Sequence, residues 1–219
     1  MKIVDRIVCA LLSFGVILAA FFAPIVHWIY QITVYGIANG LIGGLTGEYV
    51  GNANDQGWTE DDYSLYNIYK LLKDFDVDIK ALFTGNAEIN PNLEVFVPLV
   101  KPVLICFALV LVIALVTAIV SLVSKMKLPI MILSGAGIVS LIFLKSSFDK
   151  LVLPIISGKV TMGSLLDIPW LGMITKIEVI NLSGGWVMMI MLFAAIILWN
   201  VSYILTSDDK NKAVKKKGN

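Results

Sequence analysis

Four long stretches without charged residues constrain the fold of this chain more than any other feature. They cover residues 7–28, 103–123, 128–144 and 186–205. About 20 apolar residues in a helix are enough to cross the roughly 30 Å hydrocarbon core of a bilayer. The chain is also 58% hydrophobic and only 15% charged, whereas soluble domains are about 25% charged. The sequence therefore predicts an all-α integral membrane protein, built as a bundle of four transmembrane helices.

The first stretch has a second interpretation, as a cleaved signal peptide. Residues 1–6 are short and basic, and small residues recur at Ala19, Ala20 and Ala23. The apolar run nevertheless continues to Tyr30 without the polar region that a signal peptidase prefers. The pattern favours an uncleaved membrane anchor.

The positions of the basic residues predict the orientation. Lys2 and Arg6 precede the first stretch, Lys125 and Lys127 lie between the second and third, and residues 207–219 hold five lysines. Basic residues next to a span resist translocation, so these segments are expected on the cytoplasmic side. An even number of spans places all three basic segments on the same side of the membrane. We therefore expect a multi-pass plasma-membrane protein with both termini in the cytoplasm.

This topology divides the chain into a single membrane domain, residues 1–206, and a basic cytoplasmic tail, residues 207–219. The outer loops, residues 36–94 and 146–182, would form an extracytoplasmic cap over the bundle. The first loop has ten acidic residues against three lysines, and neither loop contains cysteine, which is typical of a bacterial envelope protein. The second loop has an apolar cluster around Trp170, which either packs within the chain or docks a partner.

A glycine repeat begins the first outer loop. Gly36, Gly40 and Gly44 are spaced by four, so a helix would place them on one face that another backbone can approach. The alternatives are a helical extension of the first span, a re-entrant segment, a glycine-rich loop, or the lining of a pore.

An amphipathic helix is expected further along the same loop, from residue 60 to residue 74. Thr59 followed by Asp62 resembles a capping box at its start. Tyr63, Tyr66 and Tyr69 would then lie along the helix, either as packing residues or as a contact surface for a partner.

Residues with catalytic or metal-binding chemistry are few. The chain has one histidine, His27, and two cysteines, Cys9 and Cys106, and the four stretches contain no Asp or Glu. No catalytic, cofactor or metal site is therefore expected. A net charge of +1 with a single arginine also disfavours nucleic acid as a partner.

The four-span plan with a large first outer loop is similar to that of claudin-type proteins. Trp28 followed by Gly44 and Leu45 matches part of the outer-loop signature of that group. Thr46 replaces the next tryptophan, and no paired cysteines follow before Glu94. Neither residues nor function are transferred from this similarity.

The leading functional hypothesis is a non-catalytic subunit or scaffold of a plasma-membrane complex. It would contact the lipid bilayer through its spans and a membrane or envelope protein through its acidic cap. The alternative is a channel or facilitator for small solutes or cations, formed by a homo-oligomer, in which the glycine repeat lines the path.

Overall fold

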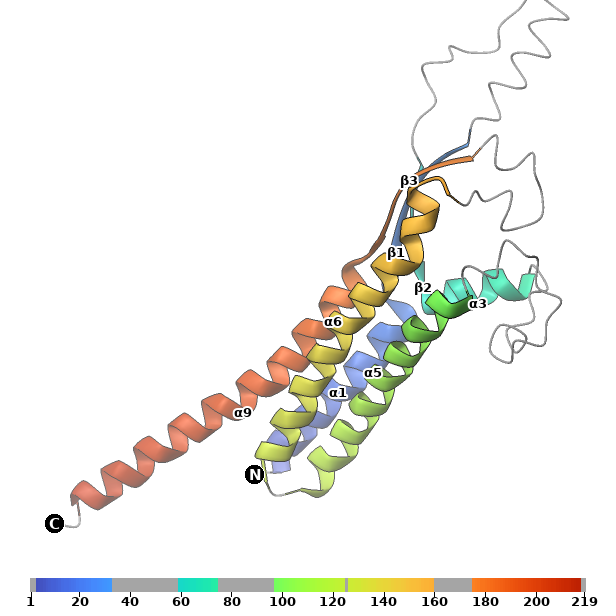
Figure 1. Ribbon diagram of the computed structural model, residues 1–219. Coiled ribbons are helices and arrows are strands. Elements are labelled where there is room, and N and C mark those ends of the chain that lie inside the picture. Colours follow the sequence, from blue (N-terminus) through green and yellow to red (C-terminus); the bar gives the residue numbers. More distant parts are fainter. Residues whose placement is uncertain (1–2, 33–58, 75–96, 125, 160–174, 218–219) are drawn as a thin grey trace, which may run out of the picture. The chain divides into compact units, whose positions relative to one another are not determined.

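The computed structural model describes residues 3–32, 59–74, 97–124, 126–159 and 175–217 (Figure 1). Four long helices occupy most of this part of the chain: α1 (Ile3–Phe22), α5 (Val97–Val123), α6 (Leu128–Ile156) and α9 (Gly184–Lys217). A short helix, α3 (Leu65–Asp74), and three strands, β1 (Pro24–Ile32), β2 (Thr59–Ser64) and β3 (Thr175–Leu182), complete the described elements.

The chain forms two compact units. The first, the bundle unit, contains Met1–Ala23, Leu104–Leu144 and Gly184–Asn219. The second, the sheet unit, contains Pro24–Val103 and Lys145–Ser183.

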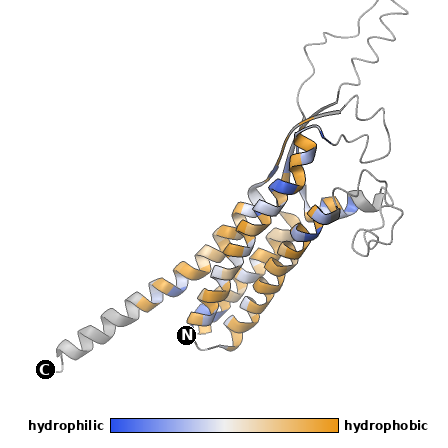
Figure 2. Cartoon of the chain, in the orientation of Figure 1, coloured by the Kyte–Doolittle hydropathy of each residue, from blue (hydrophilic) through white to orange (hydrophobic). Residues whose placement is uncertain are grey.

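All four long helices are apolar enough and long enough to cross a membrane. The candidate spans are Ile3–Phe22, Pro98–Val123, Leu128–Ile156 and Gly184–Ile204. Hydrophobic residues cover most of α1, α5 and α6 (Figure 2). The predicted four-helix arrangement is confirmed at this level, and the chain is a multi-pass membrane protein.

Small, branched and aromatic side chains fill the interior of the bundle unit. Val16, Ala20 and Ile130 are fully buried, as are Phe193 and Ile196 of α9. Large apolar side chains on the outside of the helices remain exposed, as expected where lipid is the surrounding solvent.

The sheet unit is built around a three-stranded antiparallel sheet with strand order β2-β1-β3. One face of this sheet is apolar. Trp28 of β1 and Ile180 of β3 pack in one cluster with Phe148 and Val152, from the last turns of α6. This burial provides the hydrophobic contribution that a small sheet needs for stability.

The sheet corrects three of the predictions. The chain is not all-α, because β1 begins at Pro24, where the first span was expected to continue to residue 28. Proline has no backbone N–H to donate to a helix, and the β-branched Ile25 and Val26 that follow favour a strand. The helix expected from residue 60 begins instead at Leu65, and the residues before it form β2.

The second outer segment and the tail also contain regular structure. The last turns of α6 extend to Ile156 and β3 begins at Thr175, both inside the expected loop 146–182. The final helix continues through the expected tail as far as Lys217.

Candidate functional site

A row of polar side chains crosses the sheet. His27 of the central strand β1 pairs in register with Asp62 on β2 and with Asn181 on β3. The His27 Nδ1 atom lies 3.2 Å from Asp62 Oδ1, and Ser183 Oγ donates a hydrogen bond of 2.9 Å to the same oxygen. Ser183 also donates its backbone N–H to the Ile25 carbonyl at 2.6 Å. We call His27, Asp62 and Ser183 the sheet clasp, because they connect all three strands or their ends.

The clasp contains the residue types of a hydrolytic triad but not its arrangement. A nucleophilic serine needs an imidazole as its base, with the carboxylate on the far side of that imidazole. Here the Asp62 carboxylate lies between the serine and the imidazole, and a single oxygen contacts both. The geometry of these three residues is that of a structural link between strands.

The clasp lies on the face of the sheet opposite the apolar cluster. Successive residues of a strand point to opposite faces, and Trp28, next to His27, belongs to the apolar cluster. Glu60, Asp62 and Asn181 are exposed to solvent. We call the surface formed by Glu60, Asp62 and Asn181 the polar sheet face.

Tyr63 lies on the apolar side of the sheet. Its ring is 6.3 Å from that of Trp28, and its hydroxyl donates to Asp61 Oδ2 at 3.4 Å. Burial raises the pKa of Tyr63, and the negative charge of Asp61 and the hydrogen bond to it act in the same direction. The Tyr63 ring therefore packs against that of Trp28.

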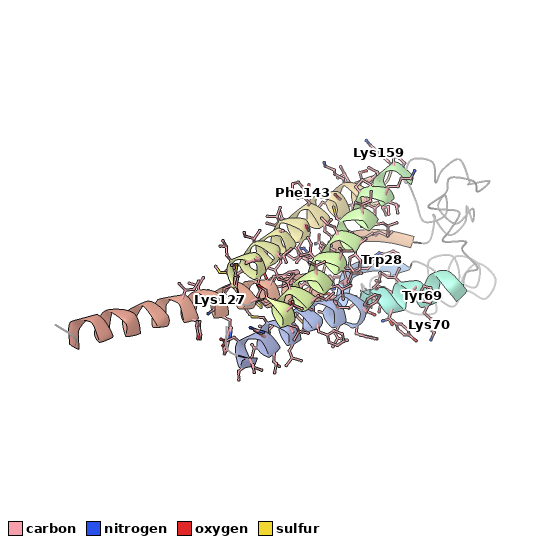
Figure 3. The ribbon with its side chains drawn as sticks, turned by 90° about the horizontal axis from the view of Figure 1, so that it is seen from below. Trp28, Tyr69, Lys70, Lys127, Phe143 and Lys159 are labelled. Atoms are coloured by element: carbon pink, nitrogen blue, oxygen red, sulfur yellow. The ribbon has the colours of Figure 1, made fainter. Side chains whose placement is uncertain are left out.

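The other two predicted tyrosines lie on α3. Ser64 caps this helix, because its Oγ accepts the backbone N–H of Asn67 at 3.2 Å. Tyr66 is 56% exposed and Tyr69 is 54% exposed. Tyr69 and Lys70 project from the same helix (Figure 3), and Lys70 is also exposed.

A second polar group lies inside the bundle unit. Asn200 of α9 is fully buried and donates through Nδ2 to the Ile196 carbonyl at 2.8 Å and to Cys9 Sγ of α1 at 3.4 Å. The buried Asn200 Oδ1 has no hydrogen-bond partner within the described ranges. Ser13, one turn after Cys9, donates to the Cys9 carbonyl at 2.8 Å. The contact between Asn200 and Cys9 joins α9 to α1 inside the bundle unit.

A cation–π contact holds the turn between α5 and α6 against α9. Lys127 Nζ lies 3.1 Å from the centre of the Tyr203 ring. Burial lowers the pKa of Lys127, while the nearby Asp5 and Cys9 act to raise it. The ring thus provides a partner for an ammonium group that has little contact with water.

Several predicted site residues lie outside the described part of the chain: Gly36, Gly40, Gly44 and Trp170. Among the tyrosines, Tyr63 lies on β2, whereas Tyr66 and Tyr69 lie on α3. The clasp was not predicted, since Asp62 and Ser183 are 121 residues apart and His27 is an isolated histidine in the sequence. No local spacing signals such a contact.

The described ranges contain His, Cys, Asp and Glu side chains, which are the usual protein ligands of metal ions. No three His, Cys, Asp or Glu side chains there come together in a way that could hold a metal ion.

Comparison of the whole chain with known protein families, with curated proteins and with solved structures gives no match.

Proposed function

We propose that this chain is a non-catalytic subunit or scaffold of a plasma-membrane complex, and that it binds a membrane or envelope protein through the polar sheet face. Both termini would lie in the cytoplasm, which places the sheet unit outside the cell. The observation that supports this proposal is the asymmetry of the sheet. One face is buried against α6, while the other presents Glu60, Asp62 and Asn181 to solvent.

The polar sheet face is suited to recognition because its shape is well defined. The clasp connects strands that are distant in the sequence, and the apolar cluster holds the opposite face. A preorganised surface loses little conformational entropy when a partner binds. Its carboxylates favour a partner with a basic contact surface, since complementary charge promotes association and selects against acidic proteins.

Photo-crosslinking in the native host tests this proposal. A photoreactive amino acid at Asn181 should yield a crosslinked adduct with another membrane or envelope protein. The same group at Lys150, which is exposed on α6, serves as the matched control and should not yield that adduct. Glu60→Lys should abolish the Asn181 adduct, whereas Glu60→Gln should only reduce it. An identical adduct from both positions, or none from Asn181, would refute the proposal.

The alternative, an oligomeric channel or facilitator, has less support from the bundle unit. Thr117 and Ser134 are fully buried, but each hydroxyl donates to the carbonyl four residues earlier in its own helix. Leu141 and Phe193 occupy interior space without exposure to solvent. A path through one copy would require these side chains to move. Conductance across liposomes containing the purified protein is the measurement that would favour a channel.

A further inference from the structure

The short helix α3 begins at the end of the sheet that is joined to the membrane spans. Pro24 of β1 pairs in register with Ser64, and Leu65 is the first residue of α3. Pro24 is separated from the end of α1 only by Ala23, and α9 begins immediately after Ser183. Ser64, which directly precedes α3, therefore pairs with a residue only two positions beyond the candidate span Ile3–Phe22. A segment joined this closely to the end of a span is expected in the headgroup layer of the bilayer.

One face of α3 has the composition of a headgroup-binding surface. Tyr66, Tyr69 and Lys70 are spaced at i, i+3 and i+4, which brings them together on a helix, and all three are exposed. Leu65 and Ile68 are less exposed. Tyrosine is enriched at membrane interfaces because its ring is apolar and its hydroxyl is polar. Lysine extends its apolar stem along such a surface and places its ammonium group among phosphates. We call Tyr66, Tyr69 and Lys70 the Tyr/Lys face.

We propose that the Tyr/Lys face binds the phosphate headgroups of the bilayer that the chain's own helices span. The proposal is independent of the protein partner suggested above, because it concerns a different surface from the polar sheet face. The Lys70 charge is complementary to phosphate, and the exposed rings of Tyr66 and Tyr69 lie on the same side of α3. Binding would fix α3 at the membrane surface and thereby orient the sheet unit to which α3 is joined.

Site-directed spin labelling of the full chain tests the proposal. Cys9 and Cys106 are replaced by alanine, and a nitroxide is attached at Tyr69→Cys, which leaves Lys70 in place. The protein is reconstituted into phosphatidylcholine and phosphatidylglycerol vesicles that contain a lipid with a nickel chelate on its headgroup. Relaxation by this headgroup nickel should be several-fold stronger for the label at residue 69 than for a label at Glu60→Cys on the polar sheet face.

Substitution of the lysine tests the role of phosphate. One lysine near an anionic surface contributes binding free energy to the membrane. Loss of this contribution in Lys70→Gln should lower the ratio of membrane-bound to free α3 by about fivefold. Lys159→Gln, which alters another exposed lysine, is the matched control and should have no effect. In vesicles of an uncharged glycolipid without phosphate, the effect of Lys70→Gln should disappear.

Two results would overturn the proposal. Equal relaxation at residues 69 and 60 would show that α3 lies in water. This is the result expected if the Tyr/Lys face binds a protein partner, because the purified vesicles contain no such partner. An effect of Lys70→Gln that persists in the glycolipid vesicles, or that Lys159→Gln reproduces, would show that phosphate recognition by this face is not its cause.

Discussion

At the scale of a single residue, the absence of a side chain at Gly137 determines how closely α6 approaches α9. A Cβ atom built at this position would lie 2.6 Å from the ring of Phe193. Phe193 is fully buried, so its ring has little room to move away. Small residues at such positions allow the close backbone contacts that stabilise helix pairs in lipid.

Gly137→Ala should therefore destabilise the bundle. Overpacking of this kind typically costs about 1–3 kcal/mol, which a thermal unfolding curve in detergent would record as a lower midpoint. Gly135→Ala is the matched control, because nothing lies within 4 Å of the added atom. It should be neutral or slightly stabilising, since alanine favours a helix more than glycine does. Equal midpoints for the two variants would contradict the packing of Gly137 on Phe193.

Tyr63 should remain protonated at higher pH than an ordinary tyrosine. Burial and the Asp61 carboxylate both disfavour the phenolate, so the folded-state pKa is raised above the unfolded value. The resulting stabilisation is fully present below the unfolded pKa and is lost as the pH rises through the folded pKa. Tyrosinate absorbance is titrated in the parent protein and in Tyr63→Phe. The difference between the two curves is the titration of Tyr63, and it should occur at higher pH than that of an ordinary tyrosine. A Tyr63 titration at or below the pH range of ordinary tyrosines would contradict the raised pKa.

At the scale of the element, the boundary between β2 and α3 lies at Ser64. The run from Thr59 to Asp62 has the composition of a helix start, which is why a helix was expected from residue 60. Pairing with β1 extends these residues as a strand, and the cap is provided by Ser64. Tertiary hydrogen bonding has thus overridden a local preference.

Ser64→Ala should loosen α3 without affecting the long helices. The loss of an N-cap costs about 1 kcal/mol, which should appear as about fivefold faster amide exchange in the first turns of α3. Thr59→Ala, at the cap expected from the sequence, is the control and should leave exchange in α3 unchanged. Faster exchange from Thr59→Ala alone would favour the original prediction of a helix from residue 60.

At the scale of the whole molecule, hydropathy was sufficient to predict the four long helices but not the sheet. The apolar run of α1 continues directly into β1, so a hydropathy average cannot distinguish the helix from the strand that follows. Contacts between residues that are distant in the sequence could not be predicted either. Cys9 and Asn200 are 191 residues apart, and no local pattern indicates that they meet. The pairing of His27 with Asp62 depends on strand register, which only the folded chain defines.

The proposed topology predicts opposite labelling at the two ends of the spans. In a chain without its native cysteines, Asn181→Cys should react with an impermeant thiol reagent in intact cells. Met126→Cys, in the turn between α5 and α6 where the native side chain is 71% exposed, should react only after the membrane is opened. The reverse pattern would place both termini outside the cell.

The strand order also determines when the sheet can be completed during synthesis. His27 and Asp62 are separated by 35 residues, so β2 can join β1 soon after both emerge from the ribosome. The other edge of β1 pairs with β3, which is synthesised later. Ser183, at the end of β3, follows Asp62 by 121 residues, which include α5 and α6. Throughout that interval β1 has an open edge, which is prone to pairing with other chains. Chains that stall before β3 is made would therefore be early targets for chaperones and proteases.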